Sequence, residues 1–204
     1  MDLDPALVGA ARAHLRNAPL VIEPRRKWPP GVGERSNKKV DAGLLCEPGR
    51  ALSVENDGGW GSMVRRARDD ATPLPDDLVA AAADLVRKWA PEPAPAWVTC
   101  VPSARSPVAA DGARRLAAAL GLDFHGVAER TRDAPPQKEM ENSTQQARNV
   151  LGAFSIAEPV PSGPVLLVDD LVDSRWTFTE FGALLRDVGS GPVFPFALAQ
   201  AVGA

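Results

Sequence analysis

The chain reads Val165-Leu166-Leu167-Val168-Asp169-Asp170-Leu171-Val172-Asp173-Ser174-Arg175-Trp176-Thr177 near its C-terminal end, and this stretch decides the fold. Four apolar residues, Val165–Val168, predict a buried strand that runs directly into two acids. A short loop with hydroxyl groups then leads into a helix expected over Thr177–Val188 and ended by Gly189. A helix N-terminus that follows a strand offers free N–H groups and the positive end of the helix dipole. The stretch therefore predicts an anion site.

Polar side chains on the same stretch fit a sugar phosphate. Ser174 and Thr177 add hydroxyl donors at the start of the helix, where they can also act as helix caps. Asp169 and Asp170 can accept hydrogen bonds from sugar hydroxyls or hold Mg²⁺ through water; alternatively, they only cap and solvate the end of the strand. A sugar phosphate satisfies both the acids and the hydroxyl loop, which neither a bare phosphate nor a bare sugar does.

Helices and strands are expected to alternate upstream and downstream of this stretch. Helices are predicted at Leu74–Trp89, Asp111–Leu120 and Asn142–Val150, strands at Trp97–Val101, Asp123–Val127 and Val193–Ala199, and a loop from Glu129 to Glu141. Such alternation indicates βαβ crossovers in an α/β fold, with a mostly parallel sheet flanked by helices. Ligands of such folds bind at the carboxyl ends of the strands.

The first 72 residues have a different composition. A helix is expected at Pro5–Asn17 and a strand at Leu20–Ile22, followed by small strands and turns as far as Trp60-Gly61. Through Arg68 the chain has 12 Lys and Arg against 8 Asp and Glu, whereas the remainder has 11 against 18. We interpret residues 1–72 as a small basic α+β region and residues 73–204 as the sheet domain.

Composition excludes several classes of protein. No stretch of the 204 residues approaches 18 uninterrupted apolar residues, so no membrane span is expected. The N-terminus has acids where a signal peptide has basic residues, and we expect a cytoplasmic protein. Cys46 and Cys100 are too few for a disulfide scaffold, and with only His14 and His125 a His-based metal cluster is not expected either.

The stretch from Val165 to Thr177 resembles the 13-residue phosphoribosyl diphosphate signature of type I phosphoribosyltransferases. The resemblance implies a type I phosphoribosyltransferase-like fold and, where phosphoribosyl diphosphate is bound, Mg²⁺ as the cofactor. In that family the acids grip the ribose hydroxyls and the loop wraps the 5′-phosphate. By position, this gives Asp169 and Asp170 the ribose role and Ser174 and Thr177 the phosphate role. Asp173 falls where some members place a catalytic acid or base.

One position departs from the family pattern. The family prefers Gly directly after the first loop hydroxyl, where this chain has Arg175 followed by the bulky Trp176. If the backbone there needs a positive φ, a residue other than Gly costs on the order of 1–3 kcal/mol. Arg175 either offsets this cost by contacting the phosphate, or fills the site and marks lost catalysis. We include both residues in the predicted ribose-phosphate site.

Two more segments are similar to known families. Cys100-Val101-Pro102-Ser103-Ala104-Arg105 follows a predicted strand where type I enzymes keep a diphosphate-binding loop, which implies contacts from Pro102, Ser103 and Arg105. Arg132–Gln137 and Gln145–Phe154 are similar to a block of the ComF competence-protein family, which has a role in DNA uptake.

The order of these blocks is similar to the C-terminal phosphoribosyltransferase-like module of RecQ-like bacterial DNA helicases. That similarity also includes Ile22–Pro29, Glu47–Leu52 and Gly58–Gly61. It implies an accessory role in DNA repair, with a covalently linked helicase core as partner. The chain has neither a GxxxxGK[ST] phosphate loop nor a four-cysteine cluster, so it cannot hydrolyse ATP by that route.

A basic run in the first part has the composition of a nucleic-acid contact. In Arg25-Arg26-Lys27-Trp28 the cations would meet phosphates while Trp28 offers a face for stacking. Lys and Arg residues at 35, 38 and 39 lie nearby. A solvated charged face is the alternative, and the resemblance to helicases favours nucleic acid.

Three functions remain open at this stage. The first is a helicase accessory module that binds a ribose-phosphate ligand or nucleic acid. The second is an active Mg²⁺-dependent phosphoribosyltransferase that uses phosphoribosyl diphosphate, and the third is a ComF-like DNA-uptake factor.

Overall fold

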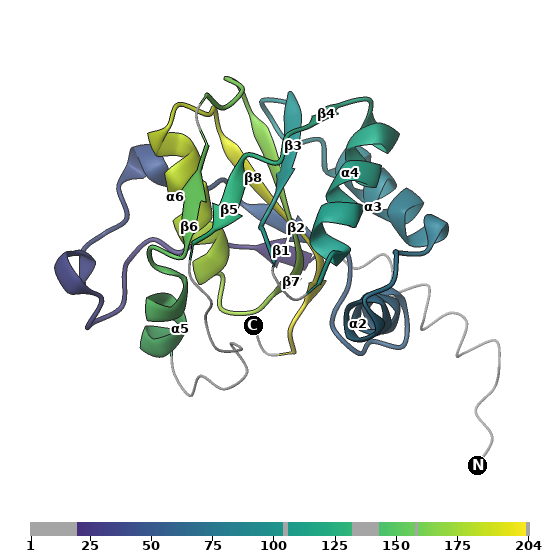
Figure 1. Ribbon diagram of the computed structural model, residues 1–204, viewed down its shortest axis with the longest axis horizontal. Coiled ribbons are helices and arrows are strands. Elements are labelled where there is room, and N and C mark those ends of the chain that lie inside the picture. The colour runs from purple at the N-terminus through teal and green to yellow at the C-terminus, as the bar shows by residue number, and fades with distance from the viewer. Residues whose placement is uncertain (1–19, 104–105, 132–142, 158, 203–204) are drawn as a thin grey trace, which may run out of the picture.

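The computed structural model describes residues 20–103, 106–131, 143–157 and 159–202 (Figure 1). The helix predicted at Pro5–Asn17 therefore lies outside the described residues. A central sheet runs through the molecule, and helices pack on both of its faces (Figure 1).

The central sheet has six strands in the order β1-β2-β8-β7-β3-β4. The bounds of these strands are β1 (Leu20–Ile22), β2 (Gly49–Ala51), β3 (Trp97–Cys100), β4 (Asp123–Phe124), β7 (Val165–Val172) and β8 (Val193–Gln200). Every neighbouring pair is parallel except β1 with β2. The predicted fold class, an α/β fold with a mostly parallel sheet flanked by helices, is confirmed.

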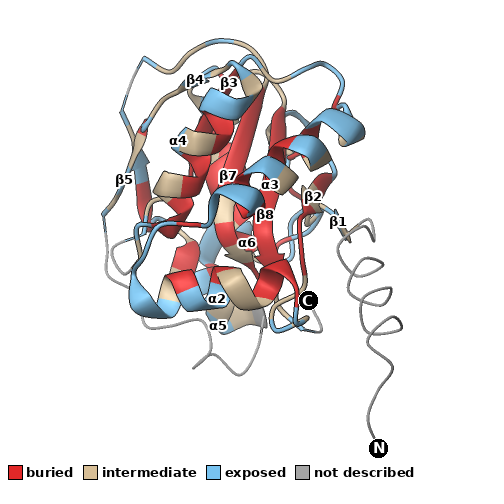
Figure 2. Cartoon of the chain, turned by 90° about the vertical axis from the view of Figure 1, so that its right-hand side faces the viewer, coloured by how far each residue is buried: buried red, intermediate tan, exposed pale blue. Residues whose placement is uncertain are grey.

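The sheet divides the apolar interior into two cores, each covered by helices. The helices are α2 (Trp60–Asp70), α3 (Asp76–Trp89), α4 (Val108–Leu120), α5 (Ser143–Val150) and α6 (Trp176–Asp187), with short 3-10 turns η1 (Gly33–Arg35) and η2 (Ala42–Leu44). Helices α2, α3 and α4 cover one face of the sheet, and α5, α6 and the segment before β2 cover the other. Figure 2 shows the buried residues on the strands and on the inward sides of the helices. None of the described helices is both long and apolar enough to cross a lipid bilayer.

Strand β7 is longer than predicted. The sequence predicts its end at Val168, but the strand continues through both acids to Val172. The neighbouring β8 supplies partners over this length, since Asp169 lies opposite Ala197 and Val172 opposite Gln200. Backbone pairing with a long neighbour therefore outweighs the polar side chains, and the acids lie within the strand rather than after it.

One helix and two strands were not predicted. Helix α2 follows a glycine-rich turn, and its buried Trp60, Val64 and Ala67 are spaced i, i+4 and i+7 on one face. Strand β5 (Ala128–Arg130) pairs antiparallel with β6 (Phe154–Ile156), where a loop was expected from Glu129 onward. Strand β5 (Ala-Glu-Arg) lacks an alternating apolar pattern, and in β6 (Phe-Ser-Ile) the alternation covers only three residues, too few for a prediction.

The first 72 residues supply strands to the same sheet as the rest of the chain. Strand β2 pairs parallel with β8, where Arg50 lies opposite Phe196 and Ala51 opposite Ala197. Gly49 allows this close approach, because a Cβ built there would lie 2.3 Å from the backbone oxygen of Pro195. The sheet is therefore continuous across the boundary predicted at residue 72.

Candidate functional site

The carboxyl end of β7 and the N-terminus of α6 are joined by Asp173, Ser174 and Arg175. Arg175 is the N-cap of α6 and has φ 69° and ψ 0°, in the left-handed region. The backbone therefore does need a positive φ at the position where the phosphoribosyltransferase signature that this stretch resembles prefers Gly. Holding Arg there costs on the order of 1–3 kcal/mol, which the surrounding contacts must offset.

The first turn of α6 leaves backbone donors for a ligand. The N–H and the hydroxyl of Thr179 both donate to the carbonyl of Arg175 at 3.0 Å. Among the described residues, the N–H groups of Thr177 and Phe178 have no acceptor. Arg175 does not cap the helix with its side chain, so the positive end of the helix dipole stays open to an anion.

Asp170 is held by a cation from α2. Its Oδ2 accepts from Arg68 Nε at 3.1 Å, and Arg68 also lies 3.8 Å from Glu55 Oε1. Side chains of Asp170 and Glu55 are both largely buried, at 12% and 11% exposed. A ribose hydroxyl at Asp170 would therefore compete with an ion pair that already exists.

Asp169 lies on the strand next to Asp170 in a different environment. Its Oδ1 accepts the N–H of Asp170 at 2.8 Å. Burial and, next, the negative charge of Asp170 raise the pKa of Asp169 well above its ordinary value, against the smaller opposing influence of Arg68 and Arg130. A raised pKa disfavours the ionised carboxylate, which is the form that binds Mg²⁺. Within the described part of the chain, no group of three or more His, Cys, Asp or Glu is placed to hold a metal ion.

The segment before β2 reaches the same loop through Arg25. Arg25 Nε donates to the carbonyl oxygen of Ser174 at 3.0 Å, and its guanidinium lies 4.9 Å from the ring centroid of Trp176. Burial lowers the pKa of Arg25, and the nearby positive charge of Arg175 lowers it further, whereas Asp173 acts in the opposite direction. The guanidinium groups of Arg25 and Arg175 therefore both lie at the loop between β7 and α6.

Asp173 connects the loop to helix α5. Gln146 on α5 donates from Nε2 to Asp173 Oδ2 at 3.4 Å. Arg175 Nε is buried and has no hydrogen-bond acceptor among the described residues. Asp173, Arg25 and Arg175 thus form a charged group around the start of α6.

Both tryptophans of the predicted sites are buried, which corrects two expectations. Trp28 is 5% exposed and Trp176 is 1% exposed, so neither offers a ring face to a base or a sugar. The two rings stack on each other, and this removes a large apolar area from water. Arg35 lies over Trp28 at 5.0 Å and pairs with Glu180 of α6. Arg25 is likewise engaged at the loop, so of the predicted nucleic-acid residues only Arg26 and Lys27 are exposed.

The predicted diphosphate loop begins beside the acids. The N–H of Val101 donates to the carbonyl of Val168 at 2.9 Å, which fixes the start of the loop next to β7. Burial and then the charge of Asp169 raise the pKa of Cys100 to about 11, as expected for neighbouring groups. Pro102 is half-buried and Ser103 is exposed, and Ser103 Oγ accepts the N–H of Ser106 at 3.2 Å. Arg105 lies outside the described residues.

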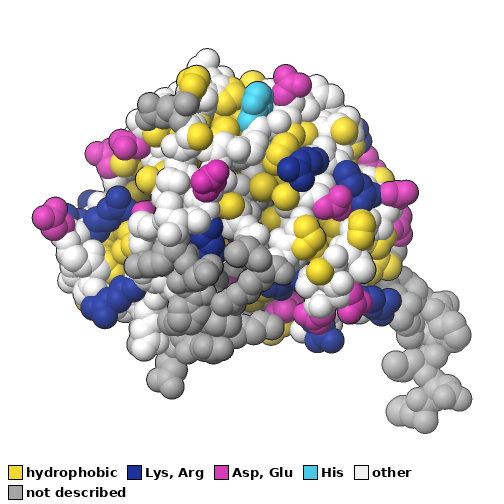
Figure 3. All heavy atoms as spheres, in the orientation of Figure 1, with side chains coloured by type: hydrophobic (Ala, Val, Ile, Leu, Met, Phe, Trp, Pro, Cys, Tyr) yellow, Lys and Arg dark blue, Asp and Glu magenta, His cyan; other side chains and the backbone are white. Residues whose placement is uncertain are grey.

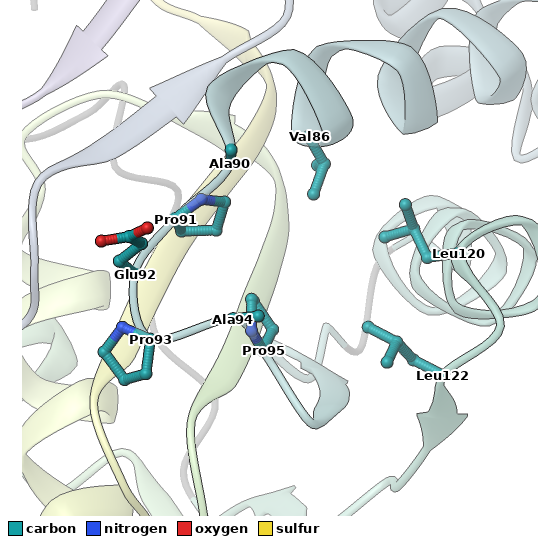
Figure 4. Close-up of a pocket in the computed structure, with 9 residues that line it drawn as sticks. All are labelled: Val86, Ala90, Pro91, Glu92, Pro93, Ala94, Pro95, Leu120 and Leu122. Carbon is teal, nitrogen blue, oxygen red and sulfur yellow. The ribbon is translucent and has the colours of Figure 1, made fainter.

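An apolar pocket of about 820 Å³ lies away from this site. Figure 4 shows Val86, Leu120 and Leu122 facing the segment from Pro91 to Pro95. The pocket is bounded by the C-terminal ends of α3 and α4 and by the segment that enters β3, so it lies at the amino end of that strand. None of the predicted site residues lines it.

Comparisons with known proteins give similarity at the level of structure only. No protein-family model matches the chain. No curated protein matches it either. Among solved structures, adenine phosphoribosyltransferase from Leishmania donovani is 15% identical over 94% of this chain and 68% of its own, with a TM-score of 0.44. The enzyme from Saccharomyces cerevisiae, in complex with an imino-altritol bisphosphate and adenine, is 14% identical over 94% of this chain and 89% of its own, with a TM-score of 0.44. The enzyme from Leishmania tarentolae is 14% identical over 62% of this chain and 72% of its own, with a TM-score of 0.40.

Proposed function

We propose that this chain is a phosphoribosyltransferase-type domain that binds a ribose phosphate at the loop between β7 and α6. In this proposal it serves as the accessory module of a RecQ-like DNA helicase and does not transfer the phosphoribosyl group. The observation that carries the binding is the open N-terminus of α6, with the cations Arg25 and Arg175 both beside it. Asp173 offsets part of the positive charge of these two guanidinium groups, and a phosphate bound at the loop would offset more of it.

The donors at the loop fit a phosphate monoester. The N–H groups of Thr177 and Phe178 have no described acceptor, and they lie at the positive end of a helix dipole. Guanidinium groups bind phosphate oxygens in a planar, two-pronged geometry that adds to these backbone contacts. The 5′-phosphate of a ribose phosphate would therefore lie at the start of α6, with its sugar toward β7.

The acids support binding of a sugar better than catalysis. Asp169 can form a hydrogen bond with a ribose hydroxyl in either protonation state, whereas Asp170 is engaged by Arg68. A transferase must stabilise the charge that develops as diphosphate leaves the sugar, for which Mg²⁺ is the related family's cofactor. Burial disfavours the ionised form of Asp169, and Arg68 engages Oδ2 of Asp170, so both features weaken direct coordination of Mg²⁺ by these acids.

Isothermal titration calorimetry with ribose 5-phosphate, ribose, inorganic phosphate and phosphoribosyl diphosphate tests the proposal. Ribose 5-phosphate is expected to bind with and without Mg²⁺, and ribose alone is not. Arg175→Ala should weaken the binding at least tenfold, whereas Arg66→Ala, an exposed cation on α2, should leave it unchanged. Absence of ribose 5-phosphate binding would refute the site.

A second measurement decides between binding and turnover. Diphosphate release from phosphoribosyl diphosphate, assayed with Mg²⁺ and each nucleobase, is expected to stay at the background rate. Diphosphate release that is lost in an Asp170→Asn variant would show that the domain is an active transferase and not only a binding module. The helicase context has its own test in the gene sequence, which is expected to continue, in frame, from an upstream helicase core. A separate upstream gene of another kind would refute the role as a helicase accessory module.

A further inference from the structure

Four exposed cations gather on a two-stranded ribbon in front of β2. We call it the basic ribbon: residues Arg26–Trp28 on one arm and Lys38–Val40 on the other. Lys27 and Lys39 form an antiparallel bridge, flanked by hydrogen bonds from Trp28 N–H to Lys38 O at 2.9 Å and from Val40 N–H to Arg26 O at 3.0 Å. This places Lys27 and Lys39 in a non-hydrogen-bonded pair, the type in which facing side chains lie closest.

The inward residues of the ribbon hold it in place. Trp28 and Val40 are 5% and 6% exposed and belong to the core that includes α6. Since side chains alternate between the two faces of a strand, Lys27 and Lys39 point away from this core, and both are exposed. The two like charges are therefore fixed opposite each other on a rigid support.

The four exposed cations of the ribbon have no ion-pair partner in the part of the chain that the structure describes. In the described residues, Arg26, Lys27, Lys38 and Lys39 form no ion pair, whereas arginines elsewhere pair with Glu180, Asp69, Asp84 or Asp76. Between residues 25 and 45 the chain has six cations and two acids. In Figure 3 dark blue side chains lie at the left margin of the molecule together with magenta ones, where the purple segment lies in Figure 1. Like charges directly opposite each other destabilise a strand pair, so this arrangement favours a polyanion as partner.

We propose that the basic ribbon binds the phosphate backbone of a nucleic acid strand without reading its bases. The phosphates would remove the repulsion between Lys27 and Lys39 and release the counterions that surround the strand. Many proteins that bind single strands stack aromatic side chains on the bases. The ribbon cannot do this with Trp28, because that ring is buried. Surface binding to membranes combines charge with inserted apolar side chains, and the apolar residues of the ribbon face the core instead. The proposal is independent of the ribose-phosphate site.

Fluorescence anisotropy with a labelled 20-nucleotide DNA strand, titrated between 50 and 200 mM KCl, tests the surface. The double variant Lys27→Ala, Lys39→Ala is expected to weaken binding several-fold at 50 mM KCl and to lower the slope of log K against log salt by about 1.4, or about 0.7 for each lost phosphate contact. Strands of different base composition should bind within twofold of one another.

The matched control is Arg66→Ala with Lys88→Ala. Both residues are exposed, form no ion pair with a described residue and lie outside the basic ribbon. This double variant removes two positive charges, as Lys27→Ala with Lys39→Ala does. It should leave the slope unchanged, and an equal loss in both double variants would overturn the assignment. Equally tight binding of poly-glutamate or of anionic vesicles would also overturn it, as would no DNA binding at 50 mM KCl.

A charge reversal separates binding from folding. Lys27→Glu turns the repelling pair into an attracting one, so the melting temperature should stay level or rise while DNA binding weakens at least as much as in the double alanine variant. Retained binding with the same salt slope contradicts the proposal.

Discussion

Trp28 and Trp176 stack with ring centroids 5.5 Å apart and ring planes 15° apart, although they are 148 positions apart in the chain. One ring comes from the segment before β2 and the other from the first turn of α6. Arg25 lies over Trp176, and Arg35 lies over Trp28 and pairs with Glu180. The stack therefore fixes the segment that carries Arg25 to the loop that carries Arg175.

Trp28→Ala is expected to lower the free energy of unfolding by about 3–5 kcal/mol, because it removes a buried ring and leaves a cavity beside Trp176. Urea unfolding followed by circular dichroism measures this loss. Trp28→Phe keeps an aromatic ring in the stack and should lose clearly less. A loss below about 1 kcal/mol for the alanine variant would mean that the segment contributes little to the fold.

The apolar run of β7 could be predicted because burial on both faces leaves a strong signal in the sequence. Its end could not, since the pairing of Asp169 with Ala197 depends on a strand that begins more than 20 residues later. Helix α2 was missed because the glycines before it indicate turns, and with it the contact of Arg68 with Asp170 was missed. That contact joins residues 102 positions apart, and no local pattern encodes it.

The anion site shows the same division between local and distant information. The positive φ of Arg175 could be expected because the signature that this stretch resembles has Gly there, and the loop itself from the strand and helix beside it. Arg25 could not be assigned to this loop, because a tryptophan next to cations fits a nucleic-acid contact as well as a buried stack. Packing against Trp176 decides between the two, and packing is not readable from one segment alone.

Asp169→Asn should remove a pH dependence of stability. A carboxyl whose folded pKa is raised contributes stability that is fully present below its ordinary pKa of 3.8 and is lost as the pH rises toward the folded pKa. Each unit of pKa difference corresponds to about 1.4 kcal/mol. The variant keeps the Oδ1 that accepts the N–H of Asp170, so it should be more stable than the wild type at pH 7, and the difference should shrink toward pH 4.

Melting temperatures between pH 4 and pH 8 check this expectation. Asp187→Asn, at an exposed position on α6, is the control for loss of one negative charge and should follow the wild-type curve. A constant difference between Asp169→Asn and the wild type across this range would show that the carboxyl is ionised in the folded protein.

Arg175→Gly and Arg175→Ala should separate backbone strain from side-chain chemistry. Gly adopts φ 69° without steric cost, so Arg175→Gly should raise the free energy of unfolding by about 0.5–1 kcal/mol after the greater freedom of Gly in the unfolded chain is included. Arg175→Ala keeps the strain and should bring no such gain. Both variants lose the guanidinium and should bind ribose 5-phosphate equally weakly. Equal stability of the two variants would mean that the loop relaxes and stores no strain.

Gly182 and Cys46 should show strong energetic coupling. A Cβ built on Gly182 of α6 would lie 2.2 Å from Cys46 Sγ, which in turn donates to the carbonyl of Phe178 at 3.3 Å. Gly182→Ala should therefore lower the free energy of unfolding by about 1–3 kcal/mol through overpacking. Adding Cys46→Ala removes the sulfur that meets the new methyl group, so the double variant should recover most of this loss.

The double-mutant cycle also tests whether the region before residue 72 folds together with the sheet. Its coupling energy is expected to be about 0.5–3 kcal/mol, as for residues in direct contact. Cys100→Ala serves as the control, because Cys100 is also buried but lies at the end of β3 in the other core, and it should not rescue Gly182→Ala. Additive effects of Cys46→Ala and Gly182→Ala would show that the two parts are not tightly packed. Strong coupling means that residues 73–204 alone lack part of their core, since Cys46 and Trp28 both come from the region that the sequence sets apart.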